Sequence, residues 1–313
     1  MRLTRTRLIA LTGGLAAIAA VGGTAALADG PAANIVVRPA AAAAPGTGSA
    51  VKPDLRRVSA QGQAGTQGTK HLEVKCPSGF RAISGSAAAT GQPAGSVVRT
   101  ENRPFHTSSG DGYATTWQAL PDAEGATWSI RATATCVQGL AGVQLVTGEE
   151  SDPSNSLPST AVCPAGSVVM GIGSKVTTTG NPWDFHYFIR GEGLKEGNRT
   201  VYTRAGLSNE SPVAGSMTST AVCAEATEYW SANFGSSDMS KTLTKSVTAR
   251  CVEGTRAYSA AADTESETWP NTARLEDVTA ADGGGRALAK VGMEGNERPD
   301  YPWQLNVTAI CAR

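Results

Sequence analysis

The sequence predicts an all-β protein made of three antiparallel β repeats of about 87 residues, with pseudo-threefold symmetry and disulfide bonds. Three observations lead to this expectation. The six cysteines form three pairs that are each separated by 60 residues, with gaps of 27 and 28 residues between the pairs. The pentapeptide Ser-Thr-Ala-Val-Cys occurs twice, at 159–163 and at 219–223. Apolar and polar residues also alternate strictly ahead of the cysteines, which is typical of β-strands.

The first 28 residues predict a secretory signal peptide. Three arginines are followed by the mostly apolar run 8–21 and by Ala26-Leu27-Ala28, whose small residues suit cleavage before Asp29. The apolar run is interrupted by Thr12, Gly13 and Gly14, so it does not predict a stable membrane span. We therefore expect a secreted, extracellular protein.

Residues 29–68 predict a flexible spacer, because they are rich in Ala, Pro and Gly and offer little apolar surface to bury. Loss of the signal arginines leaves 24 basic and 27 acidic side chains, a net charge of −3. These charges are scattered rather than gathered into a basic patch, so nucleic acid is not an expected partner.

The three predicted repeats cover 69–148, 149–236 and 237–313, and each is expected to open and close with a strand. The closing strand of the first repeat has one apolar face, formed by Trp128, Ile130, Ala132, Ala134 and Cys136. Such alternation predicts a strand with one face buried and one exposed to water, and it places Trp128 in the core. The third repeat has the same pattern from Trp303 to Cys311, whereas the second lacks the tryptophan.

The opening strands alternate in the same way, so both cysteines of a repeat point inward. We expect the pairs Cys76–Cys136, Cys163–Cys223 and Cys251–Cys311, because identical spacing is most simply explained by a bond inside the repeated unit. The alternative joins neighbouring repeats through Cys136–Cys163 and Cys223–Cys251. The interior positions include many alanines, so disulfides would compensate for a thin core.

After each opening cysteine we expect a tight turn and then a strand of small residues. The turns are Cys-Pro-Ser-Gly at 76–79, Cys-Pro-Ala-Gly at 163–166 and Cys-Val-Glu-Gly at 251–254. Proline fixes φ and glycine permits positive φ, as such turns require. The second strands are expected at 80–87, 168–176 and 256–262.

This arrangement resembles a repeat found in secreted proteins of bacteria with GC-rich genomes, most of them without assigned function. The shared motifs are the Cys-Pro-x-Gly turn and the Thr-Ala-x-Cys sequence that ends at five cysteines: Cys136, Cys163, Cys223, Cys251 and Cys311. The repeats are also similar to those of vitelline membrane outer layer proteins, which implies a β-prism. Val252 departs from the turn motif. Three separate small sandwiches remain an alternative architecture.

Catalytic and metal-binding signatures are sparse. The histidines are His71, His106 and His186, and no Gly-x-Ser-x-Gly motif accompanies them. A secreted hydrolase, with His186 as its imidazole, is therefore kept as an alternative function. The cysteine spacing offers no Cys-x-x-Cys clamp, so neither a metal nor another cofactor is expected.

Aromatic and polar residues between the framework positions predict a binding site. Flat rings stack on sugar faces while neighbouring polar groups bind hydroxyls, so the expected ligand is an extracellular polysaccharide or cell-wall glycan. The alternative for these rings is the hydrophobic core. The expected function is a non-enzymatic binding or envelope-associated module, with a purely structural coat protein as a further alternative. The candidate residues are Tyr113, Trp117, Trp183, Asp184, His186, Tyr187 and Trp269.

Overall fold

The computed structural model describes residues 53–91, 96–123, 125–154, 157–179, 187–195, 197–207, 214–227, 229–266, 273–281, 285–293 and 301–313. These residues form β-strands, turns and one short 3₁₀ helix, η1 (Pro121–Ala123), and they contain no α-helix. They all lie in the compact unit Ala32–Arg313. The predicted signal peptide lies outside them, as does the spacer before residue 53.

Each repeat contributes six strands, and the same order of strands recurs three times. The first repeat provides β1 (Asp54–Gln61), β2 (Thr69–Lys75), β3 (Arg81–Thr90), β4 (Val97–Thr107), β5 (Gly110–Ala119) and β6 (Ser129–Gln138). The second provides β7 (Gln144–Thr147), β8 (Ser159–Val162), β9 (Ser167–Thr178), β10 (Tyr187–Leu194), β11 (Thr200–Leu207) and β12 (Gly215–Glu225). The third provides β13 (Ser231–Ser236), β14 (Thr244–Arg250), β15 (Arg256–Ser266), β16 (Ala273–Ala281), β17 (Arg286–Met293) and β18 (Trp303–Ala312).

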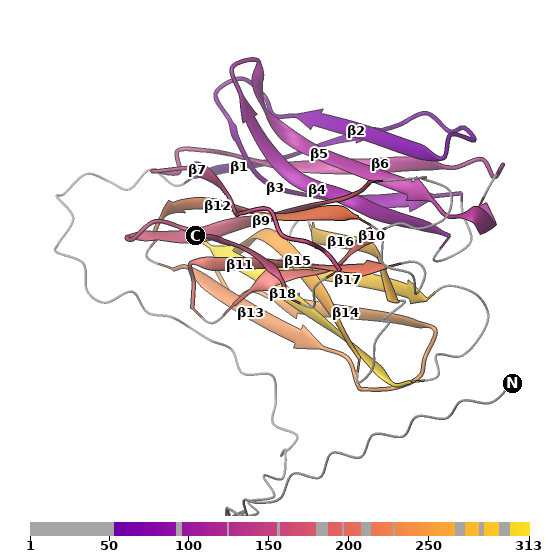
Figure 1. Cartoon of the computed structure of the whole chain (residues 1–313). Helices are drawn as coiled ribbons and strands as arrows, with labels where there is room; N and C mark the ends of the chain where they lie inside the picture. The colour runs from indigo at the N-terminus through magenta and orange to yellow at the C-terminus, as the bar shows by residue number, and fades with distance from the viewer. Residues whose placement is uncertain are drawn as a thin grey trace, which may run out of the picture. The chain divides into compact units, whose positions relative to one another are not determined.

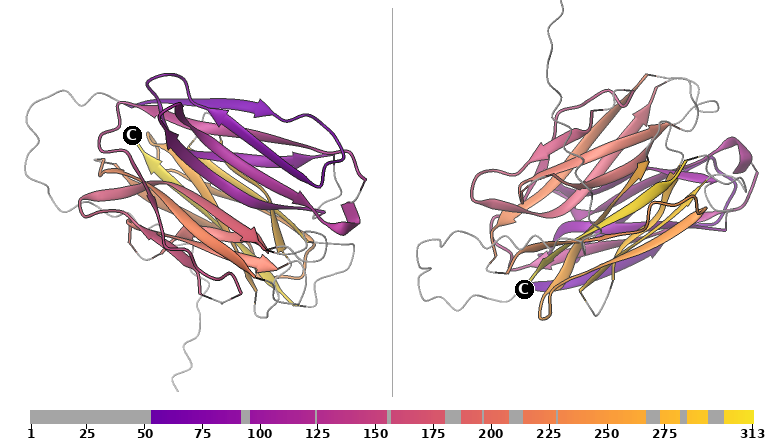
Figure 2. Two further views of the ribbon diagram at one scale, coloured as in Figure 1. Left: turned by 45° about the horizontal axis from the view of Figure 1, so that its top comes forward. Right: turned by 90° about the horizontal axis from the view of Figure 1, so that it is seen from below.

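The described strands build three six-stranded antiparallel sheets, and every sheet is shared by two repeats (Figures 1 and 2). The first, sheet B, has the order β1-β6-β3-β16-β17-β14. The second, sheet D, has the order β2-β5-β4-β9-β12-β7, and the third, sheet A, has the order β13-β18-β15-β10-β11-β8. Each repeat therefore gives three strands to one sheet and three to another. This cyclic exchange confirms the threefold all-β architecture, and it excludes three independent sandwiches.

The repeats begin earlier in the chain than the sequence predicted. The strand β1 lies inside the predicted spacer, yet it pairs with β6 along its whole length, from Asp54 opposite Gln138 to Gln61 opposite Arg131. Similarly, β7 and β13 fall before the predicted boundaries of the repeats to which their pairing assigns them. These are edge strands with weak apolar patterns, and backbone hydrogen bonding to a neighbouring strand supplies what their side chains lack.

The three disulfides join the cysteines within each repeat, which confirms the predicted pairing. The Cα atoms of Cys76 and Cys136 are 5.7 Å apart, those of Cys163 and Cys223 are 5.6 Å apart, and those of Cys251 and Cys311 are 5.7 Å apart. Each bond links the end of the repeat's second strand to its sixth strand, in a different sheet. A cross-link of this loop length stabilises a fold by about 4 kcal/mol.

The closing strands follow the predicted alternation in their first halves, except that Ser129 of β6 is buried, but not at their cysteine ends. In β6, Ile130 and Ala132 are buried while Arg131 is exposed, as expected. Towards the disulfide, however, Thr135 and Val137 are buried as well. The prediction that one face of β6 is exposed to water was wrong at this end of the strand, because Val137 belongs to a core cluster that contains residues of all three repeats.

That shared cluster contains one β-bulge residue from each repeat. Ile83, Met170 and Tyr258 occupy the bulges of β3, β9 and β15, and all three are at most 1% exposed. A bulge re-aims a side chain without ending the strand. The strands approach closely at this point, since a Cβ atom on Gly171 would lie only 1.6 Å from the carbonyl oxygen of Ile83.

The two predicted core tryptophans are buried in matching surroundings. Trp128 and Trp303 are each 1% exposed, and their indole N–H groups donate to the carbonyl oxygens of Gln67 and Thr242. The ammonium groups of Lys70 and Lys245 lie over the rings, at 5.1 and 5.0 Å from the ring centroids. In the second repeat the tryptophan position is Gly215, and the ring of Tyr187 packs against it.

Candidate functional site

Three of the seven predicted binding residues are core residues in the structure. Tyr113, Trp117 and Tyr187 are 0%, 1% and 1% exposed, so their rings offer no face to a ligand. Tyr113 donates its hydroxyl hydrogen to Asn102 Oδ1, and Trp117 Nε1 donates to Thr115 Oγ1 at 3.0 Å. Burial raises the pKa of Tyr113 well above its ordinary value. The expectation that these rings stack on sugars is corrected, because their polar groups are satisfied inside the protein.

The other four predicted binding residues lie outside the described residues. Trp183, Asp184 and His186 fall between β9 and β10, and Trp269 falls between β15 and β16. These two segments are the same connection in two successive repeats, between the third and fourth strand. They join strands of different sheets.

Each sheet carries a carboxylate at the place where two repeats meet, and we call Glu101, Asp263 and Asp277 the junction carboxylates. Glu101 of β4 pairs with Lys175 of β9, Asp263 of β15 pairs with Gly191 of β10, and Asp277 of β16 pairs with Ala88 of β3. Ala88, Lys175 and Asp263 occupy equivalent positions in the three repeats. The junction carboxylate is therefore supplied by the fourth strand of a repeat at Glu101 and Asp277, and by the third strand of a repeat at Asp263.

The Glu101 junction holds a network of charges on sheet D. Arg103 Nε donates to Glu101 Oε1 at 2.8 Å, and the Thr116 hydroxyl donates to Oε2 at 2.8 Å. Lys175 Nζ lies 4.0 Å and His71 Nδ1 lies 3.7 Å from the carboxylate. Burial acts to raise the pKa of Glu101, but these hydrogen bonds and the charges of Arg103 and Lys175 outweigh it, so the pKa is lowered.

The Asp263 junction on sheet A combines a carboxylate, a phenol and a guanidinium group. Tyr202 OH donates to Asp263 Oδ2 at 2.8 Å, and Arg204 Nη1 donates to the same oxygen at 2.9 Å. The Arg204 guanidinium lies over the Tyr202 ring, 5.2 Å from its centroid. Burial raises the pKa of Asp263 despite these two partners.

Two glycines make room for this group. A Cβ atom on Gly191 would lie 1.8 Å from Asp263 Oδ1, and a Cβ atom on Gly193 would lie 2.9 Å from the Tyr202 hydroxyl oxygen. Tyr202 and Arg204 are half-buried, so both side chains remain partly accessible from solvent. The arrangement presents a ring and charged hydrogen-bonding groups on a floor of small residues.

The Asp277 junction lies on sheet B. Thr279 donates to Asp277 Oδ1 at 2.5 Å. Burial raises the pKa of Asp277, although that hydrogen bond and the charges of Arg99, Arg131 and Lys290 act in the opposite direction. The neighbouring Glu276 lies 3.5 Å from Lys290 Nζ.

A fully buried charge network connects the first two repeats near these junctions. Arg99 Nη2 lies 3.3 Å from Glu192 Oε1, and both side chains are 1% exposed. Asn102 Nδ2 and Ser174 Oγ also donate to Glu192, at 2.6 and 2.8 Å. Burial raises the pKa of Glu192. Because no part of this network reaches the surface, it serves the fold rather than a ligand.

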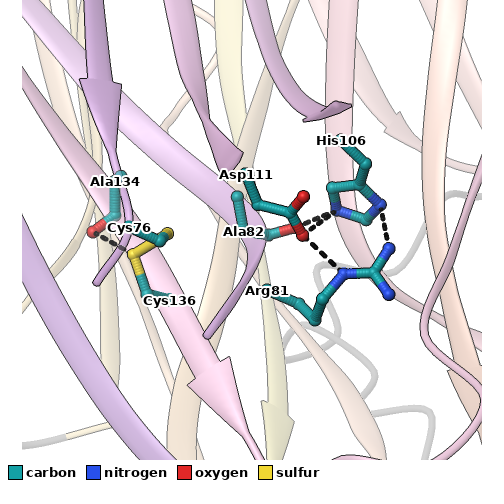
Figure 3. The surroundings of a disulfide bond; sticks show 7 residues. All are labelled: Cys76, Arg81, Ala82, His106, Asp111, Ala134 and Cys136. Carbon is teal, nitrogen blue, oxygen red and sulfur yellow. Dashed lines mark hydrogen bonds and ion pairs between the residues drawn. A yellow bond between two sulfur atoms is a disulfide. The ribbon is translucent and has the colours of Figure 1, made fainter. Parts of the chain in front are cut away.

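The described histidine with the most buried side chain, His106, has a structural environment (Figure 3). Its Nε2 lies 2.7 Å from the carbonyl oxygen of Ala82, and Arg81 Nη2 lies 2.7 Å from Nδ1. Arg81 Nε also donates to Asp111 Oδ2 at 2.5 Å. Since a carbonyl only accepts and a guanidinium only donates, the ring carries its hydrogen on Nε2. Both ring nitrogens are engaged, so His106 is not placed to act as a general base.

The described residues contain neither a metal-binding cluster nor a membrane-spanning helix. They hold no group of three or more His, Cys, Asp or Glu side chains placed to bind a metal ion. Within the same residues, no helix is long and apolar enough to cross a membrane.

No protein-family model matches the chain, and the search of curated proteins found no significant match.

The junction carboxylates escaped prediction because they come from different strands and do not share one position in the repeat. The sequence does contain one signal, since Asp263 follows three alanines in an otherwise apolar, small-residue segment. A charged residue in such a segment indicates a special partner. The register that brings Tyr202 and Arg204 to it, however, depends on pairing between two repeats.

Proposed function

We propose that this protein is a secreted, non-enzymatic binding module of the extracellular space or cell envelope, and that its ligand is a glycan. The observation that carries the proposal is the Tyr202–Asp263–Arg204 group on sheet A. A partly accessible ring beside a carboxylate and a guanidinium group suits a polyhydroxylated ligand, because the ring packs on C–H faces while the charged groups bind hydroxyls.

Secretion is supported by two features. Three disulfides indicate an oxidising compartment. The chain also begins with an arginine-rich, then apolar segment of the signal-peptide type. Within this proposal, Trp183 and Trp269 are additional ligand contacts, since the strands that flank them belong to equivalent connections of two repeats.

The test is retention of the mature chain on insoluble polysaccharides and cell-wall preparations. Tyr202→Ala and Trp183→Ala are each expected to reduce retention at least tenfold. Trp183→Ala should do so with little change in melting temperature, whereas Tyr202→Ala also removes a hydrogen bond to buried Asp263 and should lower it. Tyr301→Ala, which removes a ring that is 54% exposed elsewhere, is the matched control and should retain full binding. A Trp183→Ala variant that melts several degrees lower would instead assign that ring to the core.

Two other outcomes would replace the proposal. Hydrolysis of a polysaccharide that disappears in His186→Ala would identify a secreted hydrolase. Strong self-association with no retention on any glycan would identify a structural coat protein.

A further inference from the structure

The outward face of β14 and β17 carries an unusual pair of arginines. Arg250 and Arg286 lie directly opposite each other in the antiparallel register, and both are exposed. The alternate residues on the same strands, among them Val247, Ala249 and Ala287, are buried in a core cluster that the second and third repeats share. Because side chains alternate across a strand, both guanidinium groups are on the solvent side of the sheet.

Like charges directly opposite each other on neighbouring strands are destabilising. Among the ion pairs of the described residues, neither Arg250 nor Arg286 has a carboxylate partner. A third cation, Lys290, lies on the same face of β17, two outward residues beyond Arg286. Its Nζ atom is 3.5 Å from the Glu276 carboxylate. Lys290 also lies opposite Asp277 of β16, so it is the Arg250–Arg286 pair that keeps its positive charge without an ion-pair partner among the described residues.

Hydroxyl groups accompany these cations. Ser246 and Thr248 are exposed and alternate with Arg250 along β14, opposite Lys290 and Leu288 of β17. Successive outward residues of a strand are about 7 Å apart, and neighbouring strands are about 4.8 Å apart. The cations and hydroxyls thus form a regularly spaced array on two adjacent strands, with the exposed Leu288 among them. Such an array suits a polymer with repeated anionic and hydroxyl groups better than a single small anion.

The threefold fold does not require arginines at this place. The equivalent pair in the first repeat is Lys75 opposite Gly112, and in the second repeat it is Val162 opposite Thr200. In the first repeat, moreover, the neighbouring outward residue is the acid Glu73, where the third repeat has Thr248. The unbalanced pair is a property of the third repeat alone.

We infer that the face formed by Ser246, Thr248, Arg250, Arg286 and Lys290 binds an anionic glycan, one that carries carboxylate or phosphate groups. The inference rests on the proposed function in taking the ligand to be a glycan, but it locates the contact on sheet B, away from Tyr202. Arginine binds carboxylate and phosphate through parallel N–H donors, and the hydroxyls add neutral hydrogen bonds.

The experiment measures the affinity of the mature protein for three soluble probes at low and high salt. Polygalacturonate supplies carboxylates, poly(glycerol phosphate) supplies phosphates, and dextran is the neutral control. The wild type should bind at least one anionic probe, with an affinity that falls at least fivefold when salt is raised, because the contacts are exposed. The stronger of the two anionic probes identifies the source of the charge.

The decisive variant is Arg250→Ser/Arg286→Ser, which should weaken anionic binding about tenfold, equivalent to about 1.4 kcal/mol. The control is Lys75→Ser/Lys195→Ser, which removes two exposed cations from the other repeats and should stay within about twofold of the wild type. Equal losses in both variants would show a general charge effect and overturn the inference. Unchanged binding by the arginine variant would overturn it too.

Thermal stability provides a second readout. If the arginines are kept for a ligand, Arg250→Ser removes a repulsion and should leave the melting temperature unchanged or higher. A fall of several degrees would assign the pair a structural role and contradict the inference. Retention on neutral polysaccharides that depends on Tyr202 tests the proposed function, whereas binding of anionic probes that depends on the two arginines tests this inference. The failure of one can therefore be distinguished from the failure of the other.

Discussion

Ser159 and Ser219, the first residues of the two identical pentapeptides, contact each other directly. The backbone N–H of Ser219 donates to Ser159 Oγ at 3.0 Å, and Ser219 Oγ lies 2.9 Å from the carbonyl oxygen of Ser159. The last residues of the same pentapeptides form the Cys163–Cys223 disulfide. The repeated sequence therefore marks the two strands that close one repeat against itself.

Replacing Ser159 by alanine should destabilise the protein. The buried N–H of Ser219 would lose its acceptor, which costs about 1–3 kcal/mol. Urea unfolding of the wild type and the variant measures this difference. The control is Ser59→Ala, because Ser59 is exposed and bonds only the Thr133 hydroxyl among the described residues; it should change the free energy of unfolding by less than about 0.5 kcal/mol. Equal effects of the two substitutions would contradict the prediction.

Gly215→Ala should also destabilise, because the second repeat uses the space above Gly215 for the Tyr187 ring. The added methyl group would lie 2.4 Å from the Thr177 carbonyl oxygen and 2.9 Å from that ring. Such overpacking costs about 1–3 kcal/mol. Gly62→Ala is the matched control, since its methyl group would meet nothing closer than 3.4 Å. A melting temperature for Gly215→Ala at or above that of Gly62→Ala would disprove the packing argument.

Two junction carboxylates should give opposite pH dependences of stability. The pKa of Glu101 is lowered in the folded state, so its contribution is present above its ordinary value of 4.5 and is lost as the pH falls through the folded pKa. The pKa of Asp263 is raised, so its contribution is present below 3.8 and is lost as the pH rises through the folded pKa.

Denaturant unfolding from about pH 3 to pH 7 measures both effects. The free energy of unfolding of Glu101→Gln should be lower than that of the wild type at neutral pH, and the difference should shrink as the pH falls. The free energy of unfolding of Asp263→Asn, measured relative to the wild type, should instead increase as the pH rises. Parallel curves for the two variants would show that neither carboxylate changes its pKa on folding.

The disulfides should be reduced in a definite order under native conditions. Cys163 and Cys223 are both 0% exposed, whereas Cys76 and Cys251 are only partly buried. A thiolate reductant must reach a sulfur atom to attack it. Dithiothreitol treatment followed by alkylation and peptide mass mapping should therefore find Cys76–Cys136 and Cys251–Cys311 opened before Cys163–Cys223. Early alkylation of Cys163 would contradict the assigned burial.

Much of the fold could be predicted because it depends on patterns among residues that are close in sequence or regularly spaced. Alternation located the opening and closing strands, and equal spacing paired the cysteines. The pairing of strands between repeats could not be read in this way, because alternation tells which face of a strand is buried but not which strand lies beside it. For this reason the sequence did not predict that both faces of β6 are buried near Val137. Nor did it predict that Glu101 pairs with Lys175.

Three of the predicted binding residues were wrong for a related reason, while Trp183, Asp184, His186 and Trp269 lie outside the described residues and stay predictions. An aromatic residue flanked by polar ones fits either a ligand platform or a core position, and only the packing of two sheets decides between them. The structure decides for the core at Tyr113, Trp117 and Tyr187. Tyr202, by contrast, is half-buried, and its ring packs over its partner across the strand pair, Gly193, which has no side chain.

The exchange of strands between repeats has a consequence for synthesis of the chain. The exposed edge of β3 is completed by β16, which belongs to the last part of the chain to emerge. Until then, an early product carries an open strand edge able to pair with other molecules. A chain truncated before β16 would keep this edge open, so we expect it to aggregate rather than to form a smaller folded protein.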